Sequence, residues 1–268
     1  MTTTHTLRVA DARLHYEVRG EGPLLLLVGA PMSAAPFAQV ADVLASDHTV
    51  VTHDPRGISG SVLDDPEQDS TPELRADDIV ALLDALSADD ADILGSSGGA
   101  VTGLALVTRH PGRVRTLVAH EPPVLELLPD AAEQRAATED IVATFHREGV
   151  GAAMMKFLSN AGIIREGEAP PGPAGEPTEQ DLADSARFLA HELRGTAGYL
   201  PDIAALRAAS ARIVVGIGAD SGNLLTYRTS VALADRLGTA PVVFPGEHGG
   251  FASHPQEFAD ILRKVLAG

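Results

Sequence analysis

The sequence of 268 residues predicts an α/β fold, in which a mostly parallel eight-stranded sheet is covered by helices on both faces and carries an inserted helical cap. Short apolar runs rich in β-branched residues alternate with longer helical patterns, which is typical of such a sheet. A serine turn rich in glycine follows one of the predicted strands. An interval of roughly ninety residues contains helical patterns without a convincing strand, and a single crossover connection rarely needs that length.

The core elements follow from the pattern of apolar residues along the chain. Residues 7–10 and 14–18 are expected to form an opening hairpin, and residues 24–28 a buried strand because they are continuously apolar. The helix at 71–86 begins with Thr71 as its cap and a proline in its first turn. The other expected core elements are helices at 36–45 and 256–266 and strands at 49–52, 91–94, 115–119, 212–217 and 241–244.

The interval without strands divides the chain into two parts. Residues 1–122 and 210–268 are expected to form the core, and residues 123–209 the cap. Helical patterns within the cap lie at 131–147, 152–158 and 179–194, and a loop rich in glycine and proline lies at 167–177. The alternative is that these are crossover helices packed directly on the sheet.

The composition argues against several classes of protein. A net charge of −17, from 20 basic and 37 acidic residues, repels phosphate backbones and anionic lipids, so we expect neither a nucleic-acid nor a membrane partner. Cysteine is absent, which removes disulfides, thiolate nucleophiles and zinc sites built on sulfur. The first residues lack the apolar core of a secretory signal, and together these features favour a cytoplasmic protein.

One short stretch carries the strongest chemical signal. The residues from Gly95 to Gly99 read G-x-S-x-G, with an apolar strand-like run before them and a helical pattern after them. A serine on such a sharp strand-to-helix turn is pushed out toward a substrate, beside the N–H groups of a helix N-terminus. Ser97 is therefore the candidate nucleophile. The alternative is an ordinary Gly/Ser turn that caps a helix.

A serine nucleophile needs a base and an acid that orients the base. His248 lies on a glycine-flanked loop after the last predicted strand, and we prefer it as the base to His254, which is expected to start the final helix. Asp220 follows the strand at 212–217 and is the preferred acid, because a carboxylate past the end of a strand projects toward the ligand crevice of α/β folds. Glu121, after the strand at 115–119, is the alternative acid; otherwise it lines the pocket or anchors the cap.

The order Ser97, Asp220, His248 resembles that of the α/β-hydrolase fold superfamily. The segment 54–61, DPRGISGS, is similar to the superfamily's D-x-R-G-x-G-x-S loop, and 109–114, RHPGRV, is similar to its H-P-x-R-V segment. The resemblance implies a cap-bearing serine hydrolase without cofactor or metal. It also implies an oxyanion hole formed by the backbone N–H groups of Ala30 and Gly98, with Met32 as an apolar wall of the pocket.

These residues predict a serine esterase that acts on a small apolar molecule through a Ser-His-Asp triad and an acyl-enzyme. A lactonase or a carbon–carbon bond hydrolase would use the same triad, so both remain open. A non-catalytic ligand-binding protein on the same fold also remains open, since a fold does not guarantee chemistry. The expected partner is a small-molecule substrate, and the sequence leaves a homodimer open.

Overall fold

The computed structural model describes residues 2–164 and 177–268, so most of the predicted loop at 167–177 lies outside the described residues. Eight strands form a continuous sheet in the order β1-β2-β4-β3-β6-β7-β8-β9, and a short ninth strand, β5, pairs with β2. From β4 onward along this path, neighbouring strands are parallel, whereas β2 runs antiparallel to both of its neighbours, β1 and β4. The predicted α/β fold class is therefore confirmed. The strand bounds are β1 Thr3–Arg8, β2 Ala12–Arg19, β3 Leu24–Val28, β4 Thr49–His53, β5 Val62–Leu63, β6 Ala91–Ser96, β7 Val114–His120, β8 Arg212–Gly218 and β9 Val242–Phe244.

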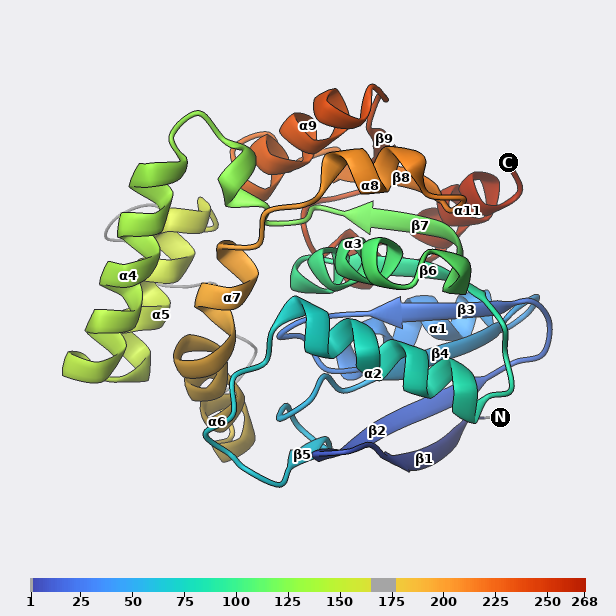
Figure 1. Ribbon diagram of the computed structural model, residues 1–268, viewed down its shortest axis with the longest axis horizontal. Helices are drawn as coiled ribbons and strands as arrows, with labels where there is room; N and C mark the ends of the chain where they lie inside the picture. Colours follow the sequence, from blue (N-terminus) through green and yellow to red (C-terminus); the bar gives the residue numbers. More distant parts are fainter. Residues whose placement is uncertain (1, 165–176) are drawn as a thin grey trace.

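Helices cover both faces of this sheet (Figure 1). Strand β3 shows why, because its alternate side chains enter two different apolar clusters. Leu25 and Leu27 pack with α1 (Ala38–Leu44) and α11 (Pro255–Leu266), whereas Leu26 and Val28 pack with α2 (Pro72–Ala85) and α3 (Gly98–Arg109). The remaining helices of the core are η1 Ala35–Phe37, η2 Pro111–Arg113, α8 Ile203–Ala208, α9 Leu225–Leu237 and α10 Gly250–Ser253.

The described chain between β7 and β8 contains helices and no strand. Helices α4 to α7 lie together beyond the ends of the strands (Figure 1), and several of them share an apolar cluster of their own. The final helix of the interval, α8, behaves differently, since its Leu206 belongs to the apolar cluster of the core. The helices of this group are α4 Ala131–Glu148, α5 Val150–Ala161, α6 Glu179–Arg187, the π-helical turn η4 Phe188–Glu192, and α7 Leu193–Ala197. The short turn η3, Leu125–Leu127, joins the two parts, since Leu125 packs with these helices and Leu127 with the core.

Helix α6 is attached to the loop that follows β4 by two charged side chains. Asp184 accepts hydrogen bonds from the N–H and hydroxyl of Ser59, at 2.9 and 2.6 Å. Arg187 donates to the carbonyls of Pro66 and Gln68 and packs on Gly57, where a Cβ atom would lie only 2.4 Å from the guanidinium. These contacts fix one end of the helical segment against the core.

Candidate active site

The backbone at Ser97 is held in an unusual conformation. Its φ of 58° and ψ of −128° lie in a region that costs a residue with a side chain roughly 1–3 kcal/mol, and such strain concentrates at functional sites. The turn closes because its flanking glycines carry no side chain. A Cβ atom on Gly99 would lie 2.0 Å from the carbonyl oxygen of Val28, and one on Gly95 would lie 2.5 Å from the carbonyl oxygen of Gly99. The sequence G-x-S-x-G thus builds the sharp turn between β6 and α3.

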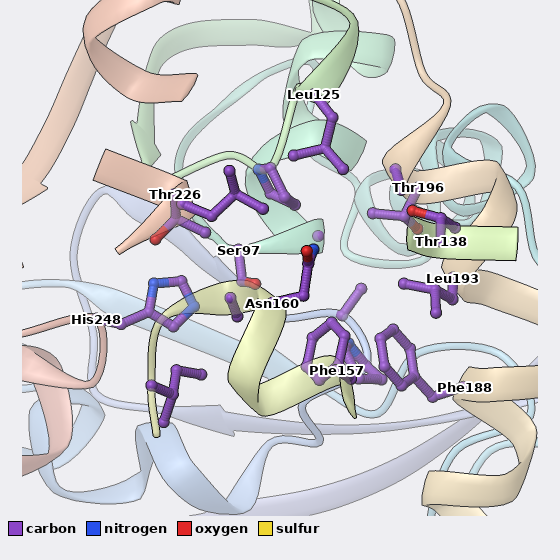
Figure 2. Close-up of a pocket in the computed structure, with 18 of the residues that line it drawn as sticks. Ser97, Leu125, Thr138, Phe157, Asn160, Phe188, Leu193, Thr196, Thr226 and His248 are labelled. Atoms are coloured by element: carbon purple, nitrogen blue, oxygen red, sulfur yellow. The ribbon is translucent and has the colours of Figure 1, made fainter. Parts of the chain in front are cut away.

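His248 lies on the loop between β9 and α10 and reaches the same cavity as Ser97. Figure 2 shows its imidazole ring turned toward the Ser97 side chain. The Nδ1 atom of the ring is 2.6 Å from Oε2 of Glu121. This bond occupies Nδ1 and leaves Nε2 as the ring nitrogen that can serve the serine.

Glu121 is fully buried directly after β7 and has a positive φ of 51°. Its Oε1 accepts the N–H of Gly218 at 2.9 Å, and its Oε2 accepts the hydroxyl of Thr226 at 3.0 Å in addition to His248. Burial by itself would raise the pKa of this carboxyl, but the hydrogen bond and charge of His248 outweigh it and lower the pKa to about 2. The side chain is an ionised carboxylate aimed at the imidazole.

Asp220, the acid preferred from the sequence, is not paired with His248. The residue is exposed, and its backbone N–H donates to the carbonyl of Gly246 at 2.9 Å. Strand β8 ends at Gly218, so Asp220 lies on the outward part of the loop, and Glu121 from the neighbouring strand β7 fills the space beside the imidazole. The sequence also suggested Glu121 as a pocket residue, but Glu121 is not among the residues that line the cavity. The carboxylate that contacts His248 is that of Glu121, not Asp220.

Ala30 and Gly98 lie against each other at the entrance to the turn. Both line the cavity, and a Cβ atom on Gly98 would come within 2.5 Å of the carbonyl oxygen of Ala30. Within the described parts of the chain, neither backbone N–H donates a hydrogen bond to another protein group. Gly98 is also the first residue of α3, where N–H groups carry the positive end of the helix dipole. The two groups are available to an anionic oxygen beside Ser97.

The cavity has a volume of about 250 Å³ and is lined by residues of the loops at the strand ends and of helices α4, α5 and α7. Its walls are mostly apolar, and Met32 is one of them, at the position expected from the sequence. Six of its lining residues carry polar side chains: Ser97, Thr138, Asn160, Thr196, Thr226 and His248. The larger apolar side chains besides Met32 are Leu125, Ile141, Phe157, Ile163, Phe188, Leu193, Leu224 and Leu225.

A second histidine lies behind the first. His120 is fully buried, and its ring stacks near that of His248 with 6.3 Å between the ring centroids. Burial lowers the pKa of His120 to about 4, so this ring is neutral at neutral pH. Among the residues that the structure describes, no three His, Asp or Glu side chains are grouped so as to hold a metal ion, and no helix is long and apolar enough to span a membrane.

Comparison with known proteins decides the family. The profile of the alpha/beta hydrolase fold matches residues 22–151. Over 268 aligned residues, the chain is 36% identical to the uncharacterized hydrolase YraK of Bacillus subtilis (strain 168), with 97% of this chain and 95% of that protein covered. The chain belongs to the α/β-hydrolase family. The matched relatives are named hydrolases, which assigns hydrolase activity to this protein.

Two further matches agree with this α/β-hydrolase assignment. The zearalenone hydrolase of Bionectria ochroleuca is 26% identical over 263 residues, which cover 92% of this chain and 91% of that protein. The structure of a thermophilic esterase from Thermogutta terrifontis superposes with a TM-score of 0.75 at 18% identity, covering 100% of this chain and 98% of that one. At that identity the superposition shows the fold alone.

The order of strands in the sheet explains why Glu121, and not Asp220, lies beside His248. In the sheet of this α/β-hydrolase, β7 is the direct neighbour of β6, which ends at the serine turn, whereas β8 is one strand further away. His120 at the end of β7 accepts the N–H of Ser97 through its carbonyl, at 3.0 Å. A carboxylate on the next residue therefore starts closer to the serine than one after β8.

Proposed function

We propose that this protein hydrolyses an ester-type bond of a small apolar substrate through Ser97, His248 and Glu121. The observation that carries the proposal is the fully buried, ionised carboxylate of Glu121, 2.6 Å from Nδ1 of an imidazole whose other nitrogen faces the Ser97 cavity. A buried carboxylate bound to the far nitrogen of such a histidine is the arrangement that a serine nucleophile requires. We also infer that the helices of residues 123–198 are the cap that closes the cavity.

In the proposed reaction, Nε2 of His248 accepts the proton of the Ser97 hydroxyl as its oxygen attacks the substrate carbonyl. Glu121 keeps the proton on Nδ1 and stabilises the imidazolium that forms. The N–H groups of Ala30 and Gly98 bind the resulting oxyanion, at about 3 kcal/mol for each donor. The imidazolium returns the proton to the leaving alcohol. Water, deprotonated by the same histidine, then releases the acid from the serine.

The cavity supports a substrate with an apolar body. A volume of about 250 Å³ bounded mainly by aliphatic and aromatic side chains accommodates a short or medium-length acyl chain or an apolar alcohol. A lactone is an internal ester and would react at the same serine, so ester and lactone substrates belong in one panel.

The test is a panel of p-nitrophenyl esters, lactones and thioesters together with a fluorophosphonate probe that labels activated serines. Ser97→Ala is expected to lose turnover by about 10⁴-fold or more and to lose labelling, because the attacking oxygen is removed. Ser96→Ala is the matched control, since the buried hydroxyl of Ser96 lies 3.3 Å from His120 and outside the cavity. It should retain labelling. Folded wild-type protein that is neither labelled nor active on any substrate would overturn the proposal in favour of a ligand-binding protein.

A further inference from the structure

We propose that Asn160 selects substrates that carry a hydrogen-bond donor, an amide N–H, close to the bond that is cleaved. This inference rests on the proposed function, because the substrate would occupy the cavity that Ser97 and His248 line. It specifies the substrate class further: an ester whose acyl part is apolar but contains a secondary amide. The argument depends on which way the Asn160 amide faces.

A chain of hydrogen bonds fixes that orientation. Arg228 binds the carboxylate of Asp130 at 2.7 Å, and the bonds from Arg228 and Gln134 lower the pKa of Asp130, so this group can only accept. Gln134 must therefore turn its Nε2 toward Asp130, at 2.9 Å, which leaves its Oε1 on the other side. That oxygen accepts a bond from Nδ2 of Asn160 at 3.3 Å. Because Nδ2 of Asn160 is bound to Gln134, the carbonyl oxygen of Asn160 faces away from this series of hydrogen bonds.

The Asn160 amide enters the cavity from α5. Figure 2 shows it projecting between Ser97 on one side and Thr138 and Thr196 on the other. Its side chain is half-buried, and within the described residues its carbonyl oxygen accepts no hydrogen bond. A bound substrate that excluded water without supplying a donor would leave this oxygen without a hydrogen bond, which weakens binding of such a substrate.

Three other polar side chains that line the cavity make hydrogen bonds within the protein. Thr138 donates to the backbone carbonyl of Gln134 at 3.0 Å, and Thr226 donates to Glu121 at 3.0 Å. Thr196 accepts a hydrogen bond from Arg75 at 2.9 Å. Asn160 presents the one carboxamide oxygen among the described residues that line the cavity, and a carboxamide oxygen is a stronger acceptor than a threonine hydroxyl.

The test uses two esters that differ in one group. The amide ester is p-nitrophenyl N-butanoylglycinate, and the reference ester is p-nitrophenyl (butanoyloxy)acetate, in which oxygen replaces the N–H. The ratio of their kcat/KM values, from nitrophenolate release after subtraction of buffer hydrolysis, is compared between proteins. Asn160→Leu should lower the wild-type ratio by about tenfold, because an aliphatic side chain of similar size accepts no hydrogen bond. An unchanged ratio would overturn the proposal.

Two variants separate this role from general damage to the cavity. Thr138→Val removes from the same wall a hydroxyl that donates to Gln134 and is not the assigned acceptor, so it should change the two esters alike and leave their ratio intact. Gln134→Leu frees the Asn160 amide to rotate and should lower the ratio part of the way. A ratio that fell equally in Thr138→Val would also contradict the assignment.

A binding measurement keeps this inference separable from the proposed function. In Ser97→Ala, calorimetric titration with N-butanoylglycine methyl ester should show an affinity that falls about tenfold when Asn160→Leu is added, in line with loss of one hydrogen bond. If neither nitrophenyl ester is cleaved through Ser97, the proposed function fails, while this titration still decides on Asn160. Equal affinities in both proteins would reject the role of Asn160 whatever the outcome for catalysis.

Discussion

Two buried glutamates, Glu121 beside His248 and Glu192 between η4 and α2, differ in the hydrogen bonds that their carboxylates accept. Glu121 accepts bonds from a histidine, a hydroxyl and a backbone N–H, and its pKa falls to about 2. Glu192 lies in the π-helical turn η4 with 1% of its surface exposed, and neither carboxylate oxygen has a hydrogen-bond partner among the described residues. Burial raises its pKa, although Arg75 lies 3.8 Å away.

The difference shows that a nearby positive charge does not replace hydrogen bonds. The guanidinium of Arg75 directs its N–H groups to Thr102, to the carbonyl of Ser70 and to Thr196, at 2.8 to 3.0 Å. Arg75 therefore places a positive charge near Glu192 but donates no hydrogen bond to its carboxylate. Burial penalises both carboxylates, and only the one with three donors is stabilised as an anion.

The largest effect is expected from Glu121→Gln. The amide offers N–H groups to His248 where the carboxylate accepted one, so the imidazole takes the wrong tautomer and the imidazolium loses its counter-charge. Turnover on the best ester should fall by roughly 10³–10⁴-fold, as in other triads. The measurement is kcat/KM beside a circular dichroism spectrum.

The matched control is Glu192→Gln, the same change at the other buried glutamate. Because Glu192 does not line the cavity or contact His248, this variant should retain most of the wild-type turnover. Equal losses in the two variants would mean that Glu121 acts on stability rather than on the histidine.

Arg75→Met is expected to have the second largest effect, on stability. It removes the cation beside Glu192 and three hydrogen bonds from a side chain that is 2% exposed. Breaking a buried pair in this way costs about 3–5 kcal/mol in the free energy of unfolding, measured by urea denaturation. Adding Glu192→Gln to Arg75→Met should recover part of the loss; additive losses would show that the two residues are not coupled.

The pH dependence of stability should distinguish Glu192→Gln from the wild type. The folded-state pKa of Glu192 is raised above its ordinary value of 4.5, so the folded protein retains a proton that the unfolded chain releases. The stability that this proton contributes is complete below pH 4.5 and is lost as the pH rises through the folded-state pKa. The wild type should therefore lose stability relative to Glu192→Gln above pH 4.5. A difference between the two proteins that is independent of pH would contradict the raised pKa.

The smallest effect is expected from Asp220→Asn. The side chain is exposed and the backbone N–H, which is unchanged, makes the bond to Gly246. Turnover should change by less than about twofold, since a surface substitution of this kind has little energetic effect. A loss comparable to that of Glu121→Gln would restore Asp220 as the acid.

The core of the fold was predictable because its strands are buried on both faces. Strand β3, for example, contains no polar residue. The serine turn was recognisable in the sequence because close packing requires glycine on both sides of Ser97. Helix α9 was not predicted. Its buried Thr229 and Ser230 donate their hydroxyls to the backbone carbonyls of Pro122 and Thr226, so polar residues occupy positions where the helical pattern expects apolar ones.

The choice between Asp220 and Glu121 depends on distances across the sheet, which chain order does not contain. Both residues follow a core strand, and both strands end at the same edge. What separates them is the direction of each side chain, set by a positive φ at Glu121 and by the turn after Gly218. The strand β5, of two residues, was too short to leave a pattern in the sequence.

The hydrogen bonds by which Asp184 and Arg187 attach α6 to the core bear on how the substrate range of this protein can evolve. Phe188 forms part of the cavity wall and directly follows Arg187. The Arg187 guanidinium donates hydrogen bonds to Pro66, Gln68 and Ser70 in the segment that follows β4. We expect a substitution that displaces Arg187 from this segment to shift Phe188, its neighbour in the chain, at the wall of the cavity. Selection could widen or narrow the site by altering residues that never meet the ligand.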